Sequence, residues 1–406
     1  MAGENTFNDS LQGLFKKIYA DKVENLVPDH VFLSKKIPFV KQNKRNGDSY
    51  QQAVILKSEH GVTYGGSSGL AFSYNDAVAG ATMQASISPA EMVLRSVVAR
   101  GALERSNNSE GAFANATKHV IENMLSSMFT KYEAQCFYGG VGLGTVASVA
   151  GNVLTITTAE WAPGIWVGSE GMKLDPYDST STSLHGAGGI SVTAVDLVAR
   201  TITVSSAASI VAGDVIYEHG AKGNEFIGVH KMITTASGNI FGLPTQTYSL
   251  WRGNTFSVGG ALSFAKVSQG IAAAVAKGVK GKLDLLVNPR TWANLLTEQT
   301  AQRIFHEGGM AEYSNGSESI MFFSINGKIE ITASPFVKEG YAYALDLASF
   351  LRIGSKDISF DNPIEPGKYI KPLDSSNAYQ IICYTDSALF CASLGKQIAF
   401  IGIQNT

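Results

Sequence analysis

Apolar residues recur at helical spacing across residues 109–138. In "SEGAFANATKHVIENMLSSMFTKYEAQCFY" they return every three or four positions, which is the period of one face of an α-helix. Ser109 suits the N-cap, and Gly139-Gly140 suit the end of the helix. At about 1.5 Å per residue, a helix of this length would extend about 45 Å. The pattern therefore predicts one long helix as the backbone of a flat, elongated domain.

The segment before this helix, residues 46–90, follows the period of β-strands. "SYQQAVILK" leads in, "HGVTYGGSSG" turns, and "LAFSYNDAVAGATMQASIS" leads out. This order predicts a long hairpin, whose legs, at about 3.3 Å per residue, can reach tens of ångströms from the body. The hairpin holds too few large apolar residues for a core of its own. We therefore expect another subunit to receive this arm.

Residues 141–230, after the helix, change to short β-branched strands. "NVLTITT", "ISVTAVD", "RTITVSS" and "GDVIYEHG" alternate between apolar and polar positions and are separated by Gly, Ser, Asp and Pro. Short strands of this kind predict an inserted β-barrel or sandwich. Trp161 and Trp166 bracket Pro163-Gly164 in this region, and we expect them to pack in its core rather than stack on nucleic-acid bases.

Helix and strand then alternate to the end of the chain, which predicts an α+β fold. "SFAKVSQGIAAAVAKG" is a helix pattern behind a Ser263 cap. A buried strand at Leu283–Val287 is followed by an Asn288 cap and by Pro289 at the first helical position. "IMFFSI", "GKIEITAS", "AYALDL", "YQIICYT" and "QIAFIGI" are further predicted strands.

Residues 1–45 combine one short amphipathic stretch with a basic segment. Pro28 and Pro38 favour an extended arm over a helix. Between His30 and Asn46 there is no acidic residue. The basic residues there are Lys35, Lys36, Lys41, Lys44 and Arg45. Such a run indicates either a solvated or subunit-facing arm, or contact with nucleic acid or an acidic partner.

Composition favours a folded protein that assembles. A chain of 406 residues is long enough for more than one packed unit. Its charged fraction of 16% is low, as expected where neighbouring subunits cover much of the surface. The net charge of −2 gives no general attraction to nucleic acid or membranes. The start of the chain has no secretion-signal pattern, and we expect no membrane partner.

The three cysteines and the polar clusters of the β-region are candidates for metal or redox chemistry. Cys136, Cys383 and Cys391 lack metal-ligand spacing, and we expect buried free thiols made in a reducing cytoplasm. Two polar groups could supply hard-metal ligands or solvated turns. The first is Asp214, Glu218, His219 and Glu225, and the second is Asp175, Asp178 and His185. Because both straddle predicted strands and turns, we expect solvated turn residues, and we expect His119 on a helix surface.

Two glycine-rich stretches resemble catalytic or nucleotide-binding motifs. Gly65 to Gly69 match Gly-x-Ser-x-Gly, in which an apolar strand leads into a nucleophilic serine and a helix follows. The lead-in "LKSEHGVTY" is polar and the exit is β-rich, so a serine hydrolase using Ser67 is the weaker alternative. "GGVGLG" at 139–144 lacks the dinucleotide spacing and follows a helix. We expect a helix stop there and no cofactor.

The complete order is an extended arm, a long hairpin, a long helix, an inserted β-region, and an α/β unit with closing strands. This order, with "DLLVNP" separated from Trp292 by two residues and with "VAGDVI", resembles the major capsid proteins of tailed bacteriophages, which have the Hong Kong 97-type fold. The resemblance implies six parts. They are an N-arm (1–45), an E-loop hairpin (46–90), a peripheral domain with the spine helix (91–140), an inserted β-domain (141–230), an axial domain with connecting strands (231–375), and C-terminal strands returning to the peripheral domain (376–406).

The resemblance implies a non-catalytic virion protein, made in the host cytoplasm, that assembles as hexamers and pentamers into an icosahedral head around double-stranded DNA. Implied partners are other copies of the chain, a separate scaffolding protein, a portal, a decoration protein and, non-specifically, packaged DNA. The β-insertion would bind a decoration protein or stiffen the subunit. A tail-tube subunit is another alternative, which the long helix disfavours. Some relatives cross-link an E-loop lysine to an asparagine, but Lys57 lacks a matching asparagine context.

Contacts between subunits are expected in the arm and the hairpin. The residues expected there are Lys35, Lys36, Lys41, Lys44, Arg45, Lys57, Tyr64, Gly65, Gly66, Ser67 and Gly69. The three glycines are expected to adopt φ values that other residues avoid. On this interpretation Gly66→Val impairs assembly and Ser67→Ala is nearly silent.

Overall fold

The computed structural model describes residues 31–41, 49–101, 116–303, 319–324, 327–360, 370–373 and 376–405. The chain divides into two compact units. The larger unit comprises Asp29–Met92, Met128–Ser359 and Tyr384–Thr406. Its elements include the barrel, the larger sheet and the hairpin, and it contains two hydrophobic core clusters. Among the described residues, no helix is long and apolar enough to cross a membrane.

A six-stranded mixed sheet forms the centre of one core of the larger unit. In spatial order its strands are β13 (Asn254–Gly260), β21 (Ile398–Ile403), β17 (Tyr341–Leu345), β14 (Leu283–Val287), β16 (Gly327–Ala333) and β15 (Ser319–Ser324). Helices α7 (Phe264–Ala276) and α8 (Pro289–Arg303) belong to the same core. The side chain of Ser263 accepts the Lys266 N–H, and that of Asn288 accepts the Arg290 N–H at 3.0 Å. Both predicted helix starts are confirmed.

The last strand, β21, lies inside the six-stranded sheet, between β13 and β17. The expected return of residues 376–406 to a peripheral domain stays a prediction. "IAFIGI" is an almost continuous apolar run, which suits a strand with neighbours on both sides and side chains buried on both faces.

Six further strands of the larger unit close into a barrel. They are β5 (Gly144–Ala150), β6 (Val153–Ile156), β7 (Lys173–Tyr177), β8 (Ile190–Asp196), β9 (Thr201–Val204) and β10 (Val215–Glu218). Leu154, Ile202 and Ile216 are buried, since alternate residues of a small closed barrel point inward and fill it. Trp161 and Trp166 are also buried and stack with ring centroids 6.1 Å apart, so the predicted packing role is confirmed.

Helix α4 (Ala116–Tyr138) confirms the predicted long helix as far as it is described. Ser109 and the side chain of His119 lie outside the described residues. The helix ends where predicted, since Gly140 has φ of +76°, outside the helical range. The preceding Gly139 allows close packing, because a Cβ there would collide with the Phe226 carbonyl oxygen. "GGVGLG" is therefore a helix stop.

Shorter elements connect these parts. In the larger unit they are α5 (Pro163–Trp166), α6 (Val229–Thr234), β2 (Tyr50–Lys57), β3 (Ala81–Ile87), β11 (Asn239–Ile240) and β12 (Leu243–Pro244). In the smaller unit, β19 (Ile370–Pro372) pairs with the first part of β20 (Ala378–Cys391), and β4 (Ala90–Ala99) also pairs with β20. The three cysteines, Cys136, Cys383 and Cys391, are buried and form no disulfide, as predicted.

The basic segment at residues 31–41 is docked on the larger unit, which corrects the expectation of an extended arm there. α2 (Leu33–Lys36) is a single helical turn with Leu33 fully buried, and β1 (Phe39–Lys41) pairs in parallel with β18 (Phe350–Ser359). The carboxylate of Glu133 accepts the N–H groups of Phe32 (3.0 Å), Leu33 (2.7 Å) and Ser34 (2.9 Å). This carboxylate satisfies the free N–H groups of the turn, a contact that local sequence does not reveal.

Glu133→Gln should loosen this docking. Burial raises the pKa of Glu133, and the three N–H donors partly offset that rise. An amide nitrogen facing the Ser34 N–H cannot accept it, and an unsatisfied buried donor costs about 1–3 kcal/mol. Hydrogen exchange of residues 31–37 should therefore be roughly tenfold faster or more, by the same estimate. Glu170→Gln, at an exposed position, is the matched control, and equal exchange in both variants would contradict the docking role.

Candidate interaction surface

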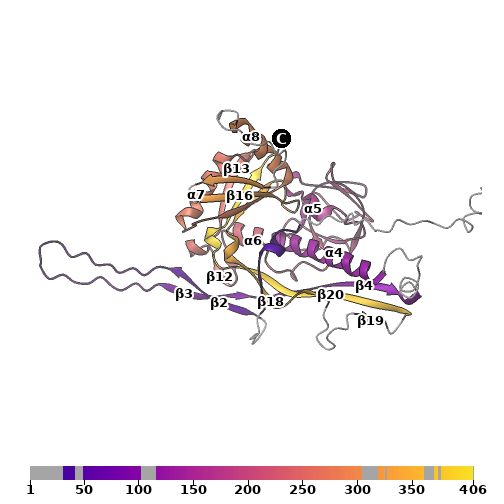
Figure 1. The fold of residues 1–406 in the computed structure, drawn as a ribbon, viewed down its shortest axis with the longest axis horizontal. Helices are drawn as coiled ribbons and strands as arrows, with labels where there is room; N and C mark the ends of the chain where they lie inside the picture. The colour runs from indigo at the N-terminus through magenta and orange to yellow at the C-terminus, as the bar shows by residue number, and fades with distance from the viewer. Residues whose placement is uncertain are drawn as a thin grey trace, which may run out of the picture. The chain divides into compact units, whose positions relative to one another are not determined.

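The hairpin remains paired beyond its two strands. β2 and β3 are antiparallel, from Tyr50 opposite Ile87 to Lys57 opposite Ala81. Further out, His60 and Val78 exchange two backbone hydrogen bonds of 2.9 and 2.7 Å. Asn75 then donates from its backbone to Thr63 Oγ1 and from its side chain to the Val62 carbonyl. The two legs thus stay opposite each other, and Figure 1 shows them reaching away from the sheet and the barrel of the same unit.

The predicted outgoing strand begins later than expected. The pattern placed it from Leu70, but β3 starts at Ala81, and residues 70–80 form only the isolated bridge at Val78. Nearly all residues of this part of the hairpin are exposed, which shows that no core lies against it. Without a core to bury alternate side chains, two strands alone are marginal.

Large apolar side chains are exposed along this part of the hairpin, which we call the hairpin tip (residues 60–78). The exposed fractions are 66% for Val62, 89% for Tyr64, 76% for Leu70, 54% for Phe72 and 86% for Tyr74. The rings of Phe72 and Tyr74 pack edge to face with centroids 6.0 Å apart. Exposed apolar groups concentrated in one segment mark an interaction site. The tip is therefore the strongest candidate for a protein contact.

The three glycines of the Gly-x-Ser-x-Gly match, Gly65, Gly66 and Gly69, differ in backbone conformation. Of these three, only Gly69 is left-handed, with φ of +67°. The ring of Phe72 lies against Gly65, where a Cβ would collide with it, and a Cβ at Gly66 would meet nothing within 4 Å. The expectation that all three need unusual φ values is confirmed for Gly69 and is wrong for Gly65 and Gly66.

The geometry around Ser67 does not match a nucleophile elbow. Ser67 lies in an exposed turn, β2 ends ten residues earlier at Lys57, and residues 70–80 contain no helix. A nucleophilic serine needs a strand directly before it and a helix directly after it. The hydrolase alternative therefore has no support from the fold.

The polar residues of the barrel pair across the two predicted groups. His185 Nδ1 lies 2.8 Å from Asp214 Oδ2, and His219 Nδ1 lies 2.7 Å from Asp175 Oδ1. Both aspartates are buried, which corrects the expectation of solvated turns for them. Asp175 also accepts the N–H groups of Gly189 and Gly220. These carboxylates therefore fasten the loops of the barrel.

The remaining acids of those groups also have structural partners. Glu225 accepts the Gly140 N–H at 2.8 Å, and Glu218 pairs with Lys131 at 2.9 Å. Asp178 accepts the N–H groups of Thr182 and Ser183; these bonds, led by the one from Thr182, lower its pKa to about 2. Within the described part of the chain, no three candidate ligands converge on a possible metal site.

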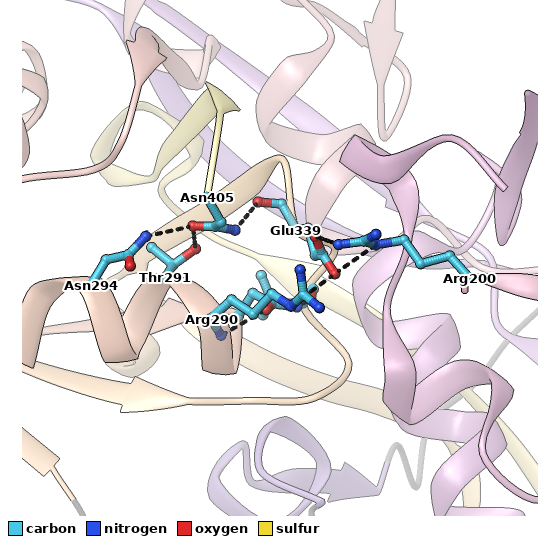
Figure 2. Close-up of polar contacts among 8 residues, drawn as sticks. Arg200, Arg290, Thr291, Asn294, Glu339 and Asn405 are labelled. Atoms are coloured by element: carbon cyan, nitrogen blue, oxygen red, sulfur yellow. Dashed lines mark hydrogen bonds and ion pairs between the residues drawn. The ribbon is translucent and has the colours of Figure 1, made fainter. Parts of the chain in front are cut away.

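A buried polar junction at Glu339 joins the barrel to the sheet and was not predicted (Figure 2). Arg200, between β8 and β9, donates from Nε and Nη2 to the two carboxylate oxygens of Glu339 at 3.1 and 3.0 Å. Arg290 of α8 lies 3.7 Å from the same carboxylate. Asn405 donates to the Glu339 carbonyl and accepts from Thr291 Oγ1. In the sequence, this junction is marked only by the adjacent charged residues Lys338 and Glu339 in "VKEG".

The neighbouring Lys338 extends this junction to the end of α4. Its Nζ donates to the Gly142 carbonyl at 3.1 Å and lies 4.4 Å from the centre of the Tyr138 ring. Burial lowers the pKa of Lys338, and Glu160 partly offsets that shift. The loop between β16 and β17 thus fastens barrel, helix and sheet together.

The predicted basic contact residues are scattered rather than joined in one site. Lys35, Lys41 and Lys57 are exposed. Lys36 Nζ lies 3.7 Å from Asp284 Oδ1. Lys44 and Arg45 fall outside the described residues.

Comparison with known proteins identifies the fold. No protein-family model and no curated protein matches the chain. Among solved structures, the capsid of cyanophage A-1(L) is similar with a TM-score of 0.59 and 12% identity, over 98% of this chain and 99% of that chain. The capsid of the native GTA particle has a TM-score of 0.52 and 7% identity, over 99% of this chain and 100% of that chain. The capsid of cyanophage P-SCSP1u has a TM-score of 0.50 and 9% identity, over 98% of this chain and 95% of that chain. The chain therefore has, over nearly its whole length, the fold of phage capsid proteins.

Proposed function

We propose that the chain is the major capsid protein of a tailed bacteriophage. Copies of it would assemble as hexamers and pentamers into an icosahedral head that encloses double-stranded DNA. The observation that carries this proposal is the similarity of fold to capsid proteins, which covers 98% of the chain and 99% of the cyanophage A-1(L) protein. The role is mechanical, and we propose no catalysis or cofactor.

The parts of the chain take the roles of the capsid family in this proposal. The docked segment at 31–41 belongs to the N-arm, and the hairpin is the E-loop. α4 is the spine helix of the peripheral domain, the barrel is the inserted domain, and the six-stranded sheet is the centre of the axial domain. Scaffolding protein, portal and decoration protein are proposed partners, and the virion is the proposed location of the protein after its synthesis in the host cytoplasm.

The hairpin tip supplies the contact between subunits in this proposal. Its exposed apolar side chains gain nothing in the isolated subunit, whereas complete burial of one such side chain is worth about 1.5–3 kcal/mol. A contact in which the tip of one subunit lies on a different surface of the next is heterologous, and such contacts form a ring where the rotation between neighbours closes. Burial of several such side chains per subunit would supply the free energy of association that holds a ring of six or five subunits.

Gly69→Val should impair assembly, whereas Gly66→Val and Ser67→Ala should not. A left-handed backbone costs a residue with a Cβ about 1–2 kcal/mol, and valine at Gly69 would therefore reshape the turn. At Gly66 the added side chain has free space. Particle yield by sedimentation, compared among the three variants, measures the difference. A larger loss for Gly66→Val than for Gly69→Val would contradict this account of the turn.

Electron microscopy of the purified chain, alone and with a scaffolding protein, tests the proposed function. Closed icosahedral shells are the expected result. Tubes would favour the tail-tube alternative, and subunits that never form capsomers or shells would refute the proposal.

A further inference from the structure

Six basic side chains gather at the end of the six-stranded sheet where the parallel strands β14 and β16 begin. They are Lys36, Arg252, Lys277, Lys280, Lys282 and Lys328, and we call them the basic surface. Lys36 comes from the docked segment. Lys277, Lys280 and Lys282 come from "KGVKGK" between α7 and β14.

Lys36, Lys282 and Lys328 of the basic surface lie near the same two acidic residues. Lys282 Nζ lies 3.2 Å from Asp284 Oδ1 and 2.6 Å from Glu330 Oε2, and Lys36 Nζ lies 3.7 Å from the same Asp284 oxygen. Asp284 and Glu330 are opposite each other in the sheet. The pKa of Glu330 is lowered chiefly by Lys282, with smaller effects of Lys36 and Lys328. Lys282 thus contacts both carboxylates, and Lys36 contacts that of Asp284.

The loop from Lys277 to Lys282 connects this group to Arg252. Lys277 Nζ donates to the Arg252 carbonyl at 2.8 Å. The chain from residue 277 to residue 282 spans at most about 18 Å, given about 3.5 Å per extended residue. Gly278 and Gly281 are left-handed, and a Cβ at either would meet nothing within 4 Å. The side of the loop that a Cβ at these positions would occupy is therefore unobstructed.

The charge balance of this surface departs from that of the chain. Six cations face Asp284 and Glu330 there, and Lys396 pairs with Asp346 at the same end of the sheet, whereas the net charge of the whole chain is −2. Within the described residues, Arg252, Lys280 and Lys328 form no ion pair. Duplex DNA carries one negative charge per about 1.7 Å of its axis, so about ten phosphates would fall within the span of the loop. Five of the six cations are lysines, which act as point charges toward phosphate.

We propose that the basic surface binds the phosphate backbone of nucleic acid without sequence preference. Contacts to phosphate position a protein on the duplex and carry no sequence information directly. The proposal concerns single subunits and does not depend on the formation of a shell, so binding can be measured apart from assembly.

Fluorescence anisotropy of unassembled full-length chain with a 30-bp duplex tests the proposal. The variant Arg252→Ala/Lys280→Ala/Lys328→Ala removes three cations that hold no ion pair. Each lost phosphate contact should reduce the slope of log affinity against log salt by about 0.9, so the slope should flatten by about two to three and the affinity at low salt should fall roughly tenfold or more. The variant Arg95→Ala/Lys173→Ala/Lys222→Ala, with the same change in charge at other positions, should bind like the original chain.

Equal binding by the two triple variants would overturn the proposal. Tighter binding to polyglutamate than to DNA would also overturn it and would point to an acidic protein partner. If the first variant fails to fold, Lys280→Glu alone, at an exposed position in the loop, tests the same surface. The single charge reversal should weaken binding to DNA, and unchanged binding would refute the proposal.

Discussion

Replacing residues 60–78 by Asn-Gly should abolish shell formation and leave the subunit folded. β2 and β3 would remain, since their pairing ends at Lys57 and Ala81, and Asn-Gly favours a tight hairpin turn. The removed residues include Tyr64, Leu70 and Tyr74, each more than three-quarters exposed. Burying several such side chains against a neighbour is worth on the order of 10 kcal/mol per subunit. Their removal should therefore shift particles to free subunits in sedimentation.

The stability of the shortened subunit provides the control. Because the tip makes few contacts with the rest of its unit, the urea midpoint of the larger unit should change little. A shortened chain that still forms closed shells would contradict the role of the tip. A shortened chain that unfolds would show that the tip supports its own subunit, which also contradicts the account.

Glu339→Ala should give the largest loss of stability in the larger unit. The carboxylate of Glu339 is buried and accepts two hydrogen bonds from Arg200, whose side chain is only 19% exposed. Removing one partner of a buried ion pair leaves the other charge unpaired and costs roughly 3 kcal/mol or more. The urea midpoint should fall, and hydrogen exchange should accelerate in the barrel strands β8 and β9 next to Arg200.

Arg290→Ala is the matched control for this prediction. The side chain of Arg290 is 52% exposed and lies 3.7 Å from the carboxylate, and exposed pairs contribute about 0–1 kcal/mol. Equal losses for Glu339→Ala and Arg290→Ala would show that the Arg200 contact is not the main fastening of the barrel.

Elements with local signals could be predicted from the sequence. The buried strand β14, the Asn288 cap and Pro289 at the start of α8 follow one another within seven residues, and all three occur as expected. The end of α4 is set by Gly139 and Gly140, which are adjacent to it. Each of these features depends on steric and hydrogen-bonding preferences of a few consecutive residues.

Features that depend on distant residues could not be predicted. Glu133 binds N–H groups about 100 positions earlier in the chain, and Glu339 binds Arg200 across 139 positions. The basic surface joins Lys36 to Lys282 through Asp284. In each case a charged residue looks like an ordinary surface residue in its own segment, and only the fold brings its partner to it.

The most direct test of the account is a cryo-electron-microscopy map of the assembled chain, with attention to where residues 60–78 lie. We predict a closed icosahedral shell in which each hairpin tip lies on a neighbouring subunit and Tyr64, Phe72 and Tyr74 are buried in that contact. A shell in which the tips point into solvent, or a particle without icosahedral symmetry, would contradict the account.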